Sequence, residues 1–118
     1  MAELNYRELV QQIIEQHATA QPPEALDTKH MVFDPKRDRY LLLYVGWHGE
    51  KRMHGCPIHI DIQDGKIWVQ RDFTEEGVAQ QLLELGVPKT DIVLGFRCPY
   101  VRQFTGFAVG ETVPDAIV

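Results

Sequence analysis

Several features that place a chain of this length in a common class are scarce here. The sequence has two cysteines, Cys56 and Cys98, too few for a disulfide framework, so we expect free thiols in a reducing compartment. No apolar run approaches the ~20 residues of a membrane-spanning helix, and the N-terminal segment lacks the charged and apolar regions of a signal peptide. These absences predict a cytoplasmic protein with no membrane association.

Positive charge is also in short supply. Seventeen acidic residues against 12 basic residues give a formal net charge of −5. A protein that neutralises many phosphates presents a basic face, so we expect no strong direct binding to DNA.

Motifs for catalysis and for cofactor binding are missing as well. The sequence has no Gly-rich phosphate loop, no G-x-S-x-G nucleophile motif and no C-x-x-C or H-E-x-x-H metal motif. Five side chains invite a zinc hypothesis, but their spacing does not match known ligand patterns: His48, His54, Cys56, His59 and Cys98. The sequence therefore predicts no metal, no cofactor and no enzymatic activity.

His59 and Asp61 fall on one face of a predicted strand, close to Trp68. A histidine beside a carboxylate is the arrangement of a general base, but no nucleophile motif accompanies the pair. A hydrogen-bonded or partner-facing pair is the favoured interpretation. Cys98, just before Pro99, is interpreted as an ordinary thiol.

Length and composition describe one globular domain. The chain has 118 residues, 44% hydrophobic and 25% charged, with no internal repeat and no linker. We predict a single domain over 1–118, with 110–118 as a tail.

Helical periodicity occurs in two segments. An apolar stripe at i, i+3, i+4, i+7 and i+8 predicts a helix over about 3–19. A second helix is predicted over about 75–85, with Thr74 as its N-cap and Gly86 at its C-terminal end.

Strand signals lie between these helices. Segments 27–34, 39–47 and 52–63 read as strands, and Asp64-Gly65 predicts a type I′ hairpin into a fourth strand ending near residue 72. The expected register runs from the Gln63–Lys66 pair to the His59–Gln70 pair. The fold class is therefore α+β: one mainly antiparallel four-stranded sheet with both helices on one face.

The segment after the second helix is short and apolar. Residues 91–96 read as a short strand or a buried extended segment. Pro99 suits the first position of a last short helix, with Val101 and Phe104 facing inward. Phe107 and Val109 are expected to dock against the core.

Strand 39–47 is apolar on both faces, so something must cover the side away from the helices. We place an aromatic and polar surface there and predict that it binds a partner, because Trp and Tyr dominate binding energy at interfaces. Its residues are Tyr40, Tyr44, His59, Asp61, Trp68 and Gln70. The alternative, that segment 91–109 covers this face, stays open.

The blocks YLLLYVGW, HGCPIHIDI, DGKIWVQRD, GVPKTDIVLGF and VRQFTGFAV together resemble the XisI family, the fdxN element excision controlling factors known chiefly from cyanobacteria. The resemblance covers about residues 3–110 and includes Trp68, Gly95 and Arg102, but it supplies no catalytic set. Cys98 and Tyr100 depart from the family's pattern, which leaves the role of loop 97–100 open.

The resemblance implies an accessory controlling factor for site-specific excision of a DNA element. Such a factor would act through contacts with a nuclease-like XisH partner, with the recombinase, or with both. Separately from the resemblance, we expect the chain to bind its partner or a second copy through the face that carries Trp68. The alternative is an antitoxin-like protein that neutralises a nuclease-like partner. An acidic chain suits either role, since it can cover a basic surface.

Overall fold

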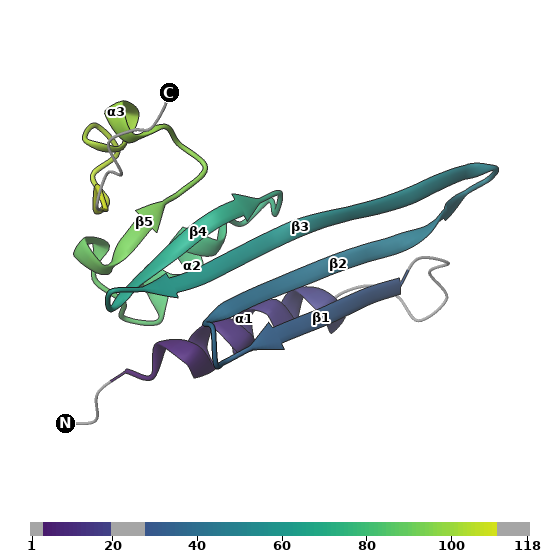
Figure 1. Ribbon diagram of the computed structural model, residues 1–118, viewed down its shortest axis with the longest axis horizontal. Helices are drawn as coiled ribbons and strands as arrows, with labels where there is room; N and C mark the ends of the chain where they lie inside the picture. Colours follow the sequence, from purple (N-terminus) through teal and green to yellow (C-terminus); the bar gives the residue numbers. More distant parts are fainter. Residues whose placement is uncertain (1–3, 20–27, 111–118) are drawn as a thin grey trace.

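The protein is a five-stranded sheet with two helices against one face (Figure 1). The structure is a computed structural model that describes residues 4–19 and 28–110. In chain order its elements are α1 (Tyr6–Thr19), β1 (Thr28–Asp34), β2 (Arg39–His48), β3 (Lys51–Gln63), β4 (Lys66–Asp72), α2 (Val78–Glu84), the 3₁₀ turn η1 (Lys89–Asp91), β5 (Ile92–Leu94) and α3 (Pro99–Arg102). The predicted α+β class is confirmed. Residues 3 and 27 and the predicted tail beyond 110 lie outside the described residues.

The strands lie side by side in the order β1-β2-β3-β4-β5. β1 to β4 pair antiparallel, and β5 pairs parallel to β4. The sheet therefore has one strand more than the four predicted, formed by part of segment 91–96. β5 runs parallel to β4 because the connection between them, through α2, crosses back over the sheet before β5 begins.

The hairpin between β3 and β4 has the predicted turn. Asp64 and Gly65 both have positive φ, 53° and 75°, as a type I′ turn requires. The predicted pairs from Gln63–Lys66 to Ile60–Val69 are confirmed, but His59 pairs with Arg71 rather than Gln70. Gln70 is the extra residue of a β-bulge, which bends the strand locally.

The core lies between the sheet and the two helices. Val10 and Ile14 of α1 and Leu82 of α2 are fully buried in one cluster with the side chains of the facing strands. These strand residues include Ile58, Ile60, Ile67 and Val69, which form one apolar face of the β3–β4 hairpin. Both helices therefore share one face, as predicted.

Tyr40 belongs to this core, which corrects its predicted place on the opposite face. It lies opposite Ile60 across β2 and β3, so it shares the face of Ile60, and it is fully buried. Its ring packs against Phe33, with centroids 5.9 Å apart. Burial and a hydrogen bond from its hydroxyl to Asp38 raise the pKa of Tyr40 to about 12.

α2 begins at Val78, later than predicted. The Asp72 carboxylate accepts a 2.7 Å hydrogen bond from the Val78 N–H and also binds Thr74, so these residues form a turn instead of a first helical turn. Thr74 Oγ1 accepts from the Gly77 N–H. Gly86 ends the helix as predicted, with φ of 98° and the paired backbone hydrogen bonds of a Schellman motif.

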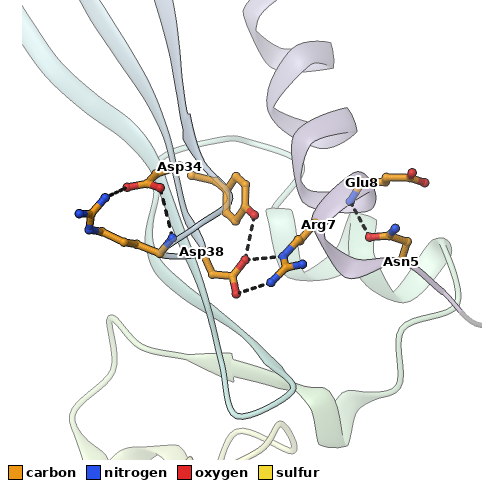
Figure 2. A network of polar contacts seen from close by, with 7 residues as sticks. Asn5, Arg7, Glu8, Asp34 and Asp38 are labelled. Carbon is orange, nitrogen blue, oxygen red and sulfur yellow. Dashed lines mark hydrogen bonds and ion pairs between the residues drawn. The ribbon is translucent and has the colours of Figure 1, made fainter.

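α1 is tied to the turn between β1 and β2 by a bidentate ion pair (Figure 2). Arg7 Nε donates to Asp38 Oδ1 at 2.7 Å, and Arg7 Nη2 donates to Oδ2 at 3.2 Å. Hydrogen bonding to Arg7, and then to Tyr40, lowers the pKa of Asp38 below its usual value. The ion pair thus fixes the N-terminal end of α1 against the sheet.

This ion pair predicts a pH dependence that Asp38→Asn should remove. Asn tolerates the positive φ of 56° at this position and keeps an acceptor for Tyr40, so the change isolates the charge. Because the folded-state pKa of Asp38 lies below its unfolded value, its stabilisation is present above the unfolded pKa and is lost as pH falls through the folded pKa. Urea unfolding should show the wild type more stable at neutral pH, with the difference vanishing in acid. A difference that stays constant with pH would contradict the assignment.

Candidate partner-binding site

Asp61 is the centre of a polar cluster on the sheet face away from the helices. Its carboxylate accepts from Arg39 Nη1 at 3.1 Å and from Gln70 Nε2 at 3.2 Å, both through Oδ2. His59 Nε2 lies 3.0 Å from Oδ1. These partners cover Asp61 so well that it is 3% exposed. We call Arg39, His59, Asp61 and Gln70 the open-face cluster.

The sheet register assembles this cluster. Arg39 lies opposite Asp61 across β2 and β3, and Asp61 lies opposite Trp68 across β3 and β4. The Gln70 amide is held from the other side by Gly95, where a Cβ would lie 2.5 Å from Gln70 Oε1. A side chain at position 95 would therefore displace the amide from Asp61.

The open face continues from the cluster as an apolar strip over β1 and β2. Val32, Leu41 and His59 form one row across three strands and so point to the same side. Val32 is exposed, and Leu41 and its neighbour Leu43 are half-buried. A polar cluster beside apolar surface is the composition of a binding face.

Trp68 is half-buried on this side of the sheet, so it is not a freely exposed side chain of the predicted partner surface. The Arg102 guanidinium lies over its ring, 5.2 Å from the centroid. Gly110 approaches the indole so closely that a Cβ there would lie 2.6 Å from it. Residues 95–110 thus cover Trp68, which is the alternative raised for this face. They do not cover the neighbouring open-face cluster.

Arg102 anchors residues 95–110 to the sheet and is 8% exposed. Its Nε donates to the Arg97 carbonyl at 2.9 Å, and its terminal nitrogens donate to the carbonyls of Val109 and Gly95 at 3.4 Å. A single guanidinium therefore joins three points of the chain around β5 and α3 and packs them on Trp68.

The inward side of α3 is occupied by Arg102, which leaves its apolar residues outside. Tyr100 is 71% exposed and Phe104 69%, and their rings meet edge to face at 5.5 Å. Phe96 and Val101 are also exposed, so the prediction that Val101 and Phe104 face inward is wrong. Phe107 packs against the core as predicted, whereas Val109 is exposed. We call Phe96, Tyr100, Val101 and Phe104 the α3 ridge.

Tyr44 lies away from both surfaces. It lines an open cleft of about 630 Å³ on the helix side, with His17, Lys29 and Phe73 among its neighbours. Of the six residues predicted to bind a partner, the structure brings together His59, Asp61, Trp68 and Gln70. It places Tyr40 in the core and Tyr44 at the cleft.

The open-face cluster is suited to binding. Asp61 is occupied by its three partners, so Arg39, His59 and Gln70 are the groups that remain part-exposed around it. Across residues 4–19 and 28–110, no three His, Cys, Asp or Glu side chains are arranged to hold a metal ion. Cys56 donates to the Ile58 carbonyl, burial raises the pKa of its thiol, and Cys98 is exposed. No helix in the part of the chain that the structure describes is long and apolar enough to cross a membrane.

Sequence reasoning missed Arg39, Arg102 and the α3 ridge. Two signals pointed to the ridge: segment 92–110 contains no acidic residue, and Tyr100 and Phe104 have the i, i+4 spacing of side chains that meet on a helix. Arg102 is among the residues covered by the resemblance to the XisI family, but an isolated arginine in a sequence is normally interpreted as exposed.

Fold and site together define an α+β protein whose sheet carries a polar cluster and an apolar strip on the face away from the helices. The family model described as XisI protein matches residues 1–109, and the chain belongs to this family. It is 39% identical to a XisI-like protein of Anabaena variabilis, with a TM-score of 0.83 over 89% of this chain and 96% of that one. It is 36% identical to the fdxN element excision controlling factor XisI of the same organism, with a TM-score of 0.75 and the same coverage. No curated protein matches the chain.

Proposed function

We propose that this protein is an accessory factor that controls site-specific excision of a DNA element in the cytoplasm. Membership of the XisI family carries this proposal, together with the 36% identity to a protein named as an excision controlling factor. The factor acts by binding an XisH-like nuclease-related partner, the recombinase, or both. It has no catalytic activity and no cofactor of its own.

The partner surface consists of the open-face cluster and the α3 ridge. The two are neighbours, because Gly95 lies against Gln70 and Arg102 joins Trp68 to α3. Exposed aromatic side chains beside a polar network match the core and rim of protein interfaces. His59, Asp61, Trp68 and Gln70 remain in the proposed site, while buried Tyr40 supports the sheet beneath it.

Protein contacts fit the charge of the molecule better than DNA contacts do. With a net charge of −5, the chain would repel the phosphate backbone but can approach a basic nucleic-acid-binding partner. Control of excision would then reach DNA through that partner.

Co-expression of this protein with an XisH-like protein tests the proposal. We expect the two to co-purify as a complex of defined mass and to separate when the open-face cluster is altered by His59→Ala with Gln70→Ala. The matched control is His54→Ala with Gln80→Ala, two exposed positions on β3 and α2. Failure of both the XisH-like protein and the recombinase to bind the wild type would overturn the proposal.

An antitoxin-like role is the second candidate, because an acidic chain can also cover the basic surface of a nuclease-like partner and neutralise it. The two roles predict opposite effects on nuclease activity. A controlling factor should direct or permit DNA cleavage and excision by its partners, whereas a neutralising protein should suppress cleavage in proportion to the complex formed. Measuring plasmid cleavage with and without this protein separates them.

A further inference from the structure

The edges of the sheet differ in how they are protected from pairing with another strand. At the β5 edge, Val93 forms a parallel bridge with Ala108, so the returning chain covers it. The part of β3 beyond the end of β4 carries Lys51 and Arg52, a bulge opposite β2, and Pro57, which has no N–H to donate. Charges, bulges and proline are the devices by which proteins block edge pairing.

β1 is less protected, because its charged residues, Lys29 and Asp34, lie near its two ends. Its seven residues pair with β2 in an unbroken register from Thr28–Val45 to Asp34–Arg39, and among the described residues β2 is its sole strand neighbour. It contains no proline and no bulge. Its one lysine is turned inward, because Lys29 Nζ donates to the His17 carbonyl at 2.8 Å. A long, regular edge of this kind presents a free row of backbone donors and acceptors.

The side chains at this edge are apolar on both faces of the sheet. Met31 is 45% exposed on the helix face, and Val32 is 41% exposed on the open face. A strand that continues the sheet lies beside both side chains at once. A helix or loop on one face would leave the other side chain in water.

We propose that the β1 edge pairs antiparallel with the β1 edge of a second copy, joining two five-stranded sheets into one. A two-fold axis through Met31 uses all seven residues and keeps the helices of both copies on the same side. The sequence TKHMVFD is self-complementary in this register. Thr28 meets Asp34, Lys29 meets Phe33, His30 meets Val32, and no like charges lie opposite each other.

A second copy is a better occupant than an unrelated strand for a further reason. In this register the exposed Met31 side chains meet at the axis. On the open face, each exposed Val32 lies opposite the His30 imidazole of the other copy and diagonally across from that copy's Val32. Pairing therefore extends the helix-side core and the apolar strip of Val32, Leu41 and Leu43 across both copies. This inference is independent of the partner-binding role.

Sedimentation equilibrium of the full chain over a dilution series tests the dimer. We expect a species of twice 13.6 kDa that dissociates on dilution. Met31→Glu places two carboxylates opposite each other at the axis and should weaken the dimer by about tenfold or more. Leu85→Glu, at a comparably exposed apolar side chain at the end of α2, should leave it unchanged. A wild type that remains a monomer throughout, or equal effects of the two variants, would overturn the proposal.

Cross-linking tests the register and does not depend on a destabilising variant. Cα atoms directly opposite in antiparallel strands lie about 5 Å apart, which suits a disulfide. In a Cys98→Ser background, Met31→Cys should therefore form a covalent dimer under mild oxidation. Thr28→Cys should not, because the two copies of residue 28 would lie about 20 Å apart along the paired strands. No cross-link at position 31, or equal cross-linking at both positions, would exclude this pairing.

Discussion

Arg102→Ala is expected to lower the free energy of unfolding by about 2–4 kcal/mol, because three carbonyl groups lose a charged donor and Trp68 loses its cover. Arg102 is 8% exposed, so water cannot simply replace the guanidinium in the intact fold. Urea unfolding at 25 °C, followed by circular dichroism, measures the loss. In a Trp47→Phe background, tryptophan fluorescence should report at the same time that the Trp68 indole has become more exposed.

Two controls make this result specific. Arg97→Ala removes an exposed guanidinium that stacks on Phe96, and it should change stability by no more than ~0.5 kcal/mol. Arg102→Lys keeps the charge but cannot present the planar set of donors, so we expect a loss between those of wild type and alanine. If Arg102→Ala were as stable as wild type, the guanidinium would not be the anchor of segment 95–110.

The local elements of the fold could be predicted because their signals lie within a few residues of each other. The Asp64-Gly65 pair determines its own turn, Gly86 ends α2, and Pro99 starts α3. The stripe of α1 likewise repeats within its own sequence. In each case the backbone conformation depends on the residue type at that position.

The side of the sheet on which a residue lies was harder to predict. The alternation along β2 places Tyr40, Leu42 and Tyr44 on one face, but β2 is apolar on both faces, so its pattern does not tell which face meets the helices. The pairing of Tyr40 with Ile60 decides this, and it depends on the β2–β3 register. The start of α2 depends in the same way on Asp72, whose carboxylate reaches six residues forward to Val78.

The candidate site was predicted in part for the same reason. His59, Asp61 and Gln70 lie on neighbouring strands of one hairpin, so the turn brings them near one another, although a bulge at Gln70 removes its predicted pairing with His59. Arg39 and Arg102 come from elements whose approach depends on packing: β2 brings Arg39 to Asp61, and the chain after β5 brings Arg102 to Trp68. No spacing in the sequence encodes either contact.

The α3 ridge predicts a loss of partner binding without a loss of stability. Tyr100→Ala and Phe104→Ala should each weaken association with the XisH-like partner by about 2 kcal/mol or more, close to 30-fold, if the two rings are interface hot spots as proposed. Because both side chains are largely exposed, the melting temperature should stay near that of wild type. Isothermal titration of purified partner into each variant, with thermal unfolding of the same samples, measures both quantities. Phe73→Ala is the matched control, since Phe73 is 70% exposed, as much as the two ridge rings, but stacks on Arg71 between β4 and α2. Wild-type affinity in the Tyr100→Ala, Phe104→Ala double variant would exclude the ridge from the interface, and an equal loss in Phe73→Ala would show that exposed aromatic area alone, not this ridge, governs binding.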